Sequence, residues 1–430
     1  MQLLHPDEIP SLVYANQKGE IKNFPEIHMA GRSGNFNFKP ALEELIPLPE
    51  GSELFLLPDR LPIGISPEND SPILLDHDPD APGERIQAVA AFMAPAHTAI
   101  HTAAYEPVRN DLAPLPLFAY TAVGWHDGKF WVSAFRSDSD CRQDARSFDN
   151  EKIKRKTIQK LAKNTRNRLI QHLGKCCLTY GCPAARNYFL GRWEAPLPTS
   201  PVCNARCIGC ISLQPSGCCP ATQDRINFVP KVSEISGIAV PHLKQAQQAV
   251  VSFGQGCEGE PLMQASTLEK AIRSIRSKTE CGTINLNSNA SLPGQVKLLA
   301  EAGLDSLRVS LNSARESCHT SYYRPVNFSF ADVLKSIDAM KQADKFVSLN
   351  YFILPGFTDD PDEFSALCKL IANHQPDLIQ LRNLNMDPDC YLDTVKYRPN
   401  QTPMGISTWL AELKGLFPAL RFGYFNPSLR

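Results

Sequence analysis

Pro201-Val-Cys203-Asn-Ala-Arg-Cys207-Ile-Gly-Cys210 is the segment from which the fold of this chain can be worked out. Its three cysteines have the spacing C-x3-C-x2-C. Thiolates are the usual ligands of iron–sulfur clusters, and three of them leave one iron of a four-iron cluster open. An open position is typical of a catalytic metal centre, whereas a structural centre is closed. The segment therefore predicts a catalytic [4Fe–4S] cluster, unless Cys218 or Cys219 supplies a fourth ligand and closes a zinc site.

The sequence downstream alternates short β-rich runs with helical runs. Strands are predicted at 249–253, 283–286, 306–311, 346–354 and 377–381, with helices near 262–277, 292–302, 329–342 and 361–374. This alternation is typical of parallel βαβ units. With a first strand entering Cys203, six units fit, so we predict an α/β fold: a partial (β/α)6 TIM-like barrel over residues 196–395. The chemistry of such a barrel lies at the strand ends and in the loops that follow them.

Glycine and polar residues follow several of these strands. Gly254-Gln-Gly-Cys-Glu-Gly-Glu260-Pro261 comes after the second strand, where glycines let the backbone approach a ligand closely and a carboxylate suits an ammonium group. Asn285-Leu-Asn287-Ser-Asn289 ends the third strand and Arg308-Val-Ser310-Leu-Asn312 ends the fourth.

In this order the motifs resemble those of the radical S-adenosylmethionine (radical SAM) superfamily, over roughly residues 196–390. The most similar branch includes the molybdenum-cofactor cyclase and the peptide-modifying enzymes. The resemblance implies that Cys203, Cys207 and Cys210 bind three irons and that the amino and carboxylate groups of S-adenosylmethionine bind the fourth. It also implies that the glycine-rich element meets the cofactor's amino group and that Leu354-Pro-Gly356 lies against adenine. The candidate cofactor-binding residues that follow from the resemblance are Gly256, Gly259, Glu260, Asn287, Asn289, Ser310, Asn312 and Arg324. Gly209 departs from the family, which commonly has an aromatic residue there.

The implied activity is that of an oxidoreductase which cleaves S-adenosylmethionine reductively. The resulting 5′-deoxyadenosyl radical would abstract hydrogen from an unidentified substrate, such as a peptide, a protein or a nucleic acid. A flavodoxin- or ferredoxin-like protein would supply the electron. Two alternatives stay open. One is a radical SAM methyltransferase with Cys257 as its catalytic methyl carrier, and the other is a non-catalytic iron–sulfur or zinc scaffold.

Further cysteines gather around the main motif. In a reducing compartment, clustered cysteines bind metal more often than they form disulfides. An auxiliary iron–sulfur cluster, a structural zinc site or simple buried thiols would each fit this group. The candidate ligands of an auxiliary cluster are Cys176, Cys177, Cys182, Cys218 and Cys219.

The remaining segments are less informative. Residues 1–150 are predicted to form a mainly β domain of unknown role, with a hairpin around Asp127-Gly128. Residues 151–195 are predicted to form a helical connector, whose helix 151–175 has a basic face that is either solvated or able to track phosphates, so nucleic acid is one candidate partner. Residues 396–430 are predicted to form a helical segment and tail.

Composition and the N-terminal sequence exclude several classes. The net charge of −1 argues against the whole molecule being an electrostatic partner of nucleic acid. The first residues, MQLLHPDEIP, lack the basic and apolar regions of a secretory signal. The most apolar early stretch, residues 88–100, is too short to span a bilayer. We therefore expect a cytoplasmic protein without membrane partners.

Overall fold

The computed structural model describes residues 8–214, 220–399 and 401–430. Contacts within the chain divide it into two compact units. The first comprises Met1–Ala145, Phe352–Cys368 and Leu381–Pro418, and the second comprises Arg146–Tyr351, Lys369–Gln380 and Ala419–Arg430. Among the described residues, none of the helices combines the length and the apolar character that crossing a bilayer requires.

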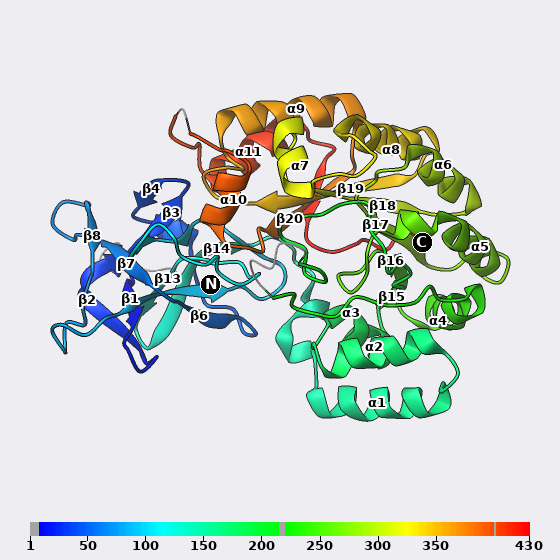
Figure 1. Ribbon diagram of the computed structural model, residues 1–430, viewed down its shortest axis with the longest axis horizontal. Coiled ribbons are helices and arrows are strands. Elements are labelled where there is room, and N and C mark those ends of the chain that lie inside the picture. The colour runs from blue at the N-terminus through cyan, green and yellow to red at the C-terminus, as the bar shows by residue number, and fades with distance from the viewer. Residues whose placement is uncertain (1–7, 215–219, 400) are drawn as a thin grey trace. The chain divides into compact units, whose positions relative to one another are not determined.

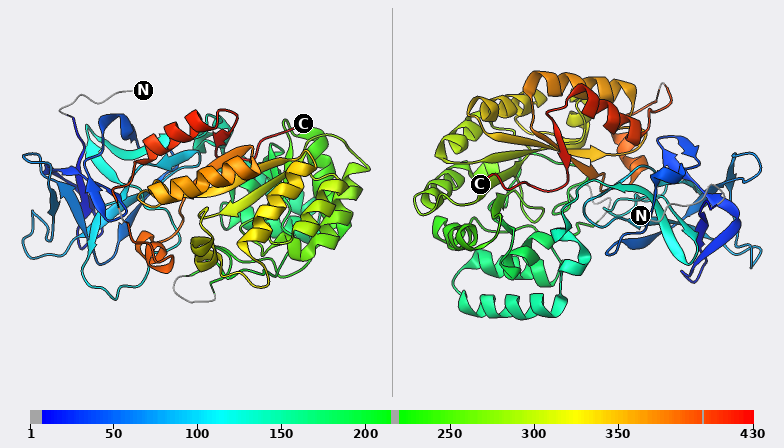
Figure 2. Two further views of the ribbon diagram at one scale, coloured as in Figure 1. Left: turned by 90° about the horizontal axis from the view of Figure 1, so that it is seen from above. Right: turned by 180° about the vertical axis from the view of Figure 1, so that it is seen from behind.

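The second unit is built on a seven-stranded sheet whose strands follow one another in chain order (Figures 1 and 2). The strands are β15 (Glu194–Pro196), β16 (Val250–Phe253), β17 (Thr283–Ser288), β18 (Ser306–Leu311), β19 (Phe346–Ile353), β20 (Leu378–Asn383) and β21 (Arg421–Gly423). The pairs from β15 to β19 and the pair β20–β21 are parallel. The five predicted strands correspond to β16–β20, so the α/β class with a parallel sheet is confirmed.

Helices join consecutive strands, as parallel pairing requires. They are α4 (Val232–Gln245), the short η4 (Pro261–Gln264), α5 (Ala265–Arg276), α6 (Pro293–Ala302), α7 (Glu316–Tyr323), α8 (Phe330–Gln342), α9 (Pro361–His374), α10 (Pro388–Thr394) and α11 (Ile406–Leu416). Helices α4, α5, α6 and α8 lie side by side on the outer face of the sheet (Figure 1).

The sheet differs from the prediction at its ends. Residues Arg421–Gly423, expected in a tail, form β21 and extend the sheet to a seventh strand. Within the described residues, β15 and β21 are the two edges, so the sheet is not a closed barrel. An open edge can be covered by other segments or left for a ligand.

The connector contains three helices rather than one long one. They are α1 (Asn150–Lys163), α2 (Arg168–Leu178) and α3 (Pro183–Leu190). The predicted helix 151–175 is therefore wrong in its continuity. The reason lies in Asn167, whose side chain accepts hydrogen bonds from the Leu169 and Ile170 amides and thus begins a new helix. Part of the basic face also stabilises the fold, because the Arg168 guanidinium donates to the Glu234 carboxylate at 2.7 Å.

The first unit has a largely antiparallel N-terminal part. Its strands are β1 (Ser11–Ala15), β2 (Ile21–Met29), β3 (Gly31–Ser33), β4 (Phe36–Phe38), β5 (Leu45–Pro47), β6 (Glu53–Leu57), β7 (Arg60–Ile65), β8 (Pro72–Leu74), β9 (Gln87–Phe92), β10 (His97–Ala99), β11 (Thr102–Ala103), β12 (Tyr105–Pro107), β13 (Val123–His126) and β14 (Lys129–Arg136). The predicted hairpin is confirmed, because β13 and β14 pair antiparallel across Asp127 and Gly128. Both turn residues have positive φ, of 45° and 71°.

A buried ion pair joins the N-terminal strands of this unit to one of its later segments. The Arg60 guanidinium lies 3.1 Å from the Asp387 carboxylate, and both side chains are buried. Asp387 also accepts the Leu115 amide at 2.8 Å. This compact unit is therefore assembled from segments that are far apart in the sequence.

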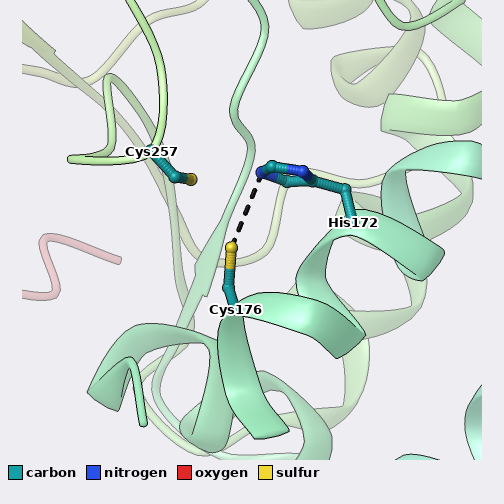
Figure 3. A group of neighbouring side chains, drawn as sticks. All are labelled: His172, Cys176 and Cys257. Carbon is teal, nitrogen blue, oxygen red and sulfur yellow. Dashed lines mark hydrogen bonds between the residues drawn. The ribbon is translucent and has the colours of Figure 1, made fainter. Parts of the chain in front are cut away.

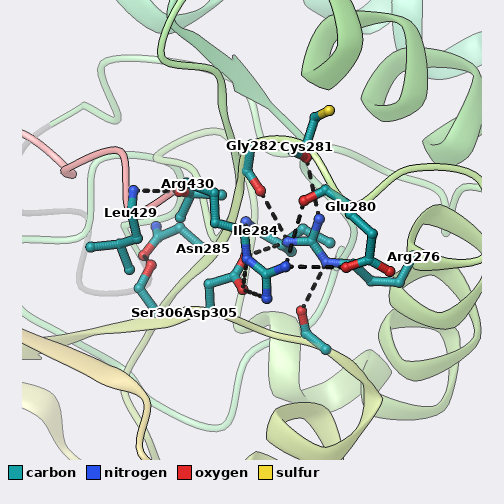
Figure 4. A network of polar contacts seen from close by, with 12 residues as sticks. Arg276, Glu280, Cys281, Gly282, Ile284, Asn285, Asp305, Ser306, Leu429 and Arg430 are labelled. Carbon is teal, nitrogen blue, oxygen red and sulfur yellow. Dashed lines mark hydrogen bonds and ion pairs between the residues drawn. The ribbon is translucent and has the colours of Figure 1, made fainter.

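Asp305 forms the corresponding buried charge in the second unit (Figure 4). Its carboxylate accepts the Ile284 amide at 2.7 Å and the Arg430 side chain at 2.8 Å. It also pairs with Arg276, which is itself mostly buried. This one carboxylate thus connects the start of β17, the end of α5 and the C-terminal segment.

We expect Asp305→Ala to lower the free energy of unfolding by about 3–5 kcal/mol, because it leaves the buried Arg276 cation without its carboxylate. Urea denaturation followed by circular dichroism measures this change. Glu280→Ala is the matched control, since Glu280 contacts Arg430 from an exposed position, and it should cost no more than about 0.5 kcal/mol. Equal effects of the two substitutions would contradict this account.

Candidate active site

The cysteine segment lies on an irregular loop between β15 and α4. Cys203, Cys207 and Cys210 are all half-buried on this loop. Backbone hydrogen bonds fix it to the end of α7: the Arg206 amide donates to the Tyr323 carbonyl at 2.9 Å, and the Ile208 amide to Tyr322 at 3.2 Å. The loop is therefore held in place by main-chain hydrogen bonds, which do not involve its thiols.

Burial and neighbouring groups act together on these thiols. Burial, helped by the charge of Glu260, raises the pKa of Cys203 to about 11. Burial raises the pKa of Cys207 well above its usual range, and the proximity of Cys203 and Cys210 adds to the shift. Such thiols ionise only when a cation compensates their charge, which is what iron supplies on binding. The donor set thus fits a thiolate-bound cluster.

Arg225 is a site residue that no sequence motif indicates. Its guanidinium donates to the Cys210 sulfur at 3.4 Å and to the Ser212 hydroxyl at 3.1 Å. Hydrogen bonds and positive charge beside a cluster thiolate tune the cluster's reduction potential. A single arginine outside any motif gives no sequence signal, because only the tertiary structure brings it to Cys210.

The glycine-rich turn after β16 packs directly against the cysteine segment. The Gly259 amide donates to the Ser200 carbonyl at 2.7 Å, and the Glu260 amide donates to the Val202 carbonyl at 2.9 Å. A Cβ at Gly259 would lie 2.1 Å from the Val202 carbonyl oxygen, and one at Gly256 would lie 2.5 Å from Ile211. Gly259 is needed for close packing against the loop backbone, whereas the neighbour of Gly256 is the end of a side chain, which can move. Contact of either glycine with a cofactor stays a prediction.

Glu258 fastens this turn to the cysteine segment. Its buried carboxylate accepts four backbone N–H groups, from Thr199, Ser200, Gly254 and Gln255, at 2.7–2.9 Å. Burial raises the pKa of Glu258 to about 7, against the lowering effect of those amides. No sequence motif indicated a role for Glu258, and its four hydrogen bonds make it the link between the two loops.

Glu260 points to the end of β17 instead. Its carboxylate accepts the Ser288 hydroxyl at 2.6 Å, the Asn289 amide at 2.8 Å and the Leu262 amide at 3.0 Å. Burial raises the pKa of Glu260 to about 7, and its charge reaches Cys203 and Cys207. Glu260 thus lies near the cysteines, with its position fixed by the residues that follow β17.

The asparagines of β17 belong to a polar network on the inner face of the sheet. Asn287 donates to the Gly254 carbonyl at 2.9 Å and accepts from Asn285 at 2.8 Å. The Asn426 amide donates to Glu194 at 2.9 Å, and Glu194 in turn accepts the Ser252 hydroxyl at 2.5 Å. Asn289 donates to Asn204 at 2.9 Å and so reaches the cysteine loop itself.

The other predicted binding residues are placed differently from one another. Ser310 is half-buried at the end of β18, whereas Asn312 is fully buried and donates to the Cys318 carbonyl at 3.2 Å. Arg324 is exposed and ends α7 with a φ of 46°. Gly356 packs against Gly34. A Cβ at position 356 would lie 1.9 Å from the Gly34 amide nitrogen. The predicted cofactor contacts of these residues stay predictions.

The remaining cysteines separate into distinct environments. Cys176 and Cys257 lie beside His172, with a histidine nitrogen 3.6 Å from the Cys176 sulfur (Figure 3). Cys177 contacts Thr157 at 3.4 Å instead, and Cys182 is the residue before α3. Cys218 and Cys219 lie outside the described residues. Cys176 and Cys257 share a hydrogen bond, which lowers the pKa of Cys176 and raises the pKa of Cys257.

Comparisons with known proteins give one family match. No curated protein sequence matches the chain. Solved structures are similar at low identity. They include the FeFe-hydrogenase maturase HydG from Carboxydothermus hydrogenoformans (13 % identity, 63 % of this chain, 69 % of that chain, TM-score 0.36). Another is methylornithine synthase PylB (13 % identity, 63 % of this chain, 77 % of that chain, TM-score 0.38). A third is Streptococcus suis SuiB bound to S-adenosylmethionine (15 % identity, 46 % of this chain, 43 % of that chain, TM-score 0.32).

The family match covers one continuous part of the chain. The model of the Radical SAM superfamily matches residues 197–368. This range contains the C-x3-C-x2-C loop, the glycine-rich turn and strands β16–β19. Enzymes of this superfamily cleave S-adenosylmethionine by a radical mechanism and depend on a reductant. Residues 197–368 are therefore a domain of the radical SAM superfamily, which uses a [4Fe–4S] cluster and S-adenosylmethionine.

Proposed function

We propose that this chain generates a 5′-deoxyadenosyl radical from S-adenosylmethionine and uses it to abstract hydrogen from a separate substrate. The observation that carries the proposal is the set of three half-buried thiols, Cys203, Cys207 and Cys210, on a loop anchored by its backbone. One electron cleaves the sulfonium to methionine and the radical, which leaves as 5′-deoxyadenosine once it has taken a hydrogen atom. A flavodoxin- or ferredoxin-like donor would provide that electron.

The protein's own residues supply position and charge. Cys203, Cys207 and Cys210 would each bind one iron, and Arg225 would offset part of the thiolate charge on Cys210. The Glu260 carboxylate is directed to the end of β17, where it would face the ammonium group of S-adenosylmethionine. Asn289 joins this region to Asn204 on the cysteine loop, so the cluster side and the cofactor side are fixed relative to each other.

The methyltransferase alternative finds less support. Cys257 as a methyl carrier would need a sulfur accessible to both cofactor and substrate. Its side chain is buried at 5 % exposure and lies against Cys176 and His172. The substrate of the proposed reaction is a macromolecule, either a peptide or protein or a nucleic acid. The exposed basic residues of α1, which include Lys152 and Lys154, favour an anionic one.

Replacing Cys203, Cys207 and Cys210 together by Ala is expected to abolish 5′-deoxyadenosine formation and remove about four irons per chain. Protein purified without oxygen and reconstituted with iron and sulfide is reduced with dithionite. Iron is then counted, and paramagnetic resonance spectra are recorded with and without S-adenosylmethionine. In the wild type, the cluster signal should shift when the cofactor is added.

Cys281→Ala is the control for this experiment, because Cys281 is exposed on the loop after α5. It should retain the iron, the spectral shift and the product. A wild-type cluster whose spectrum ignores S-adenosylmethionine, with no 5′-deoxyadenosine formed, would contradict the proposal and favour a metal-binding scaffold.

Glu260→Gln tests the proposed role of its carboxylate. A charge-assisted hydrogen bond contributes about 1.5–3 kcal/mol, so the affinity for S-adenosylmethionine should fall by roughly 10–100-fold while the iron content stays unchanged. Equilibrium binding to the reconstituted, unreduced protein measures the affinity. Glu269→Gln, on the exposed side of α5, is the control. Wild-type affinity in Glu260→Gln would remove this residue from the cofactor site.

A further inference from the structure

Three metal-ligating side chains meet outside the C-x3-C-x2-C loop. One nitrogen of His172 and the sulfurs of Cys176 and Cys257 all lie within 4.8 Å of one another (Figure 3). Cys176 is 1 % exposed and Cys257 is 5 % exposed, whereas His172 is half-buried. The three residues belong to one compact unit of the chain. Two buried thiols beside an imidazole form a donor set that suits zinc.

The spacing of the ligand atoms discriminates between kinds of metal centre. Around one tetrahedral zinc, with Zn–S near 2.3 Å and Zn–N near 2.0–2.1 Å, neighbouring ligand atoms are about 3.5–3.8 Å apart. The 3.6 Å between His172 Nε2 and the Cys176 sulfur fits this value. In a four-iron cluster each thiolate binds a different iron, so the sulfurs would stand farther apart. The geometry therefore favours a single metal ion.

The secondary structure explains why the ligands converge. His172 and Cys176 are four residues apart on α2, so their side chains lie on one face of the helix. Cys257 comes from the glycine-rich turn, where its carbonyl accepts the Ile226 amide at 2.8 Å. The next helix residue, Cys177, contacts Thr157 and cannot share the site. His172 also lines a surface hollow of about 370 Å³ together with Arg225 and Phe228, so the imidazole side of the group faces solvent, whereas neither cysteine lines this hollow.

We propose that His172, Cys176 and Cys257 bind one zinc ion, separate from the [4Fe–4S] cluster of the radical SAM domain. Of the three alternatives that the sequence left open for these cysteines, this assignment takes the zinc site, with a different set of ligands. It keeps Cys176, excludes Cys177 and adds two residues that were not considered as ligands of that site. The zinc ion would fasten the connector helix α2 to the glycine-rich turn, which also carries Glu258 and Glu260. The proposal does not depend on the radical activity, since binding is measured without S-adenosylmethionine.

The experiment measures zinc in the full-length protein, purified without chelators and without oxygen from cells supplied with zinc and iron. We expect one zinc ion per chain by mass spectrometry, and an X-ray absorption spectrum with two sulfur ligands and at least one nitrogen ligand. The Cys203/Cys207/Cys210 triple Ala variant should lose its cluster iron and keep its zinc. Failure of the radical reaction would thus be distinguishable from failure of this proposal.

Substitutions then identify the ligands. Cys176→Ser and Cys257→Ser should each lower zinc affinity by about 100-fold or more, measured against a competing chelator. Cys177→Ser, on the same helix but facing Thr157, should bind zinc as the wild type does. His172→Ala serves as the second test if a cysteine variant fails to fold, because His172 is half-buried and its loss leaves the core intact.

Several results would overturn the zinc site. Wild-type protein without zinc, or full zinc binding by Cys257→Ser, would do so. So would iron and sulfide bound to these residues in the triple Ala variant, since that would mean a cluster. A disulfide between Cys176 and Cys257 would show as two thiols missing from a titration of the denatured protein, together with absent zinc, and would also refute the proposal.

Discussion

The candidate site depends on the hydrogen bonds that the Glu258 carboxylate accepts. A buried carboxylate is costly unless its lone pairs are occupied, and four backbone amides occupy them here. Two of these amides precede the cysteine segment and two begin the glycine-rich turn. Because the contacts are to the main chain, they fix the backbone path of the residues before the cysteine segment and at the start of the turn. The cysteines and the turn are therefore positioned together, before any cofactor binds.

Fixing this turn also determines what its neighbours contact. Cys257 precedes Glu258 and lies against α2, whereas Glu260 follows it and reaches the end of β17. A single short turn thus contacts the connector, the cysteine segment and the centre of the sheet. The glycine at 259 permits this, since a Cβ there would lie 2.1 Å from the Val202 carbonyl oxygen of the cysteine segment. Gly259 is therefore explained by packing alone, and contact between this turn and a cofactor stays a prediction.

The sequence predicted the parallel sheet well, because β16–β20 are regular, buried strands joined by helices of ordinary length. It failed where a local signal was weak or absent. β21 is only three residues long and pairs at the sheet edge, so its tail carried no strand pattern. Asn167 divided the connector helix by capping, an effect that periodicity does not report. At the site, the C-x3-C-x2-C motif located the cysteines, but Arg225 and Glu258 act through tertiary contacts that spacing cannot reveal.

His172 and Cys176 illustrate the boundary between these cases. Their i, i+4 spacing on a helix is visible in the sequence, and it is compatible with a shared metal ion, yet two ligands do not define a site. The third ligand, Cys257, comes from another loop and was interpreted within its own motif. A ligand that binds only the folded chain stabilises it by an amount that grows with the logarithm of the ligand concentration divided by Kd. A zinc ion here would therefore hold α2 against the turn by coordination. Apolar packing would do less at this point, because His172 is only half-buried. The position of the turn, and with it that of Glu260, would then be set from two sides: by the amides around Glu258 and by the metal at Cys257.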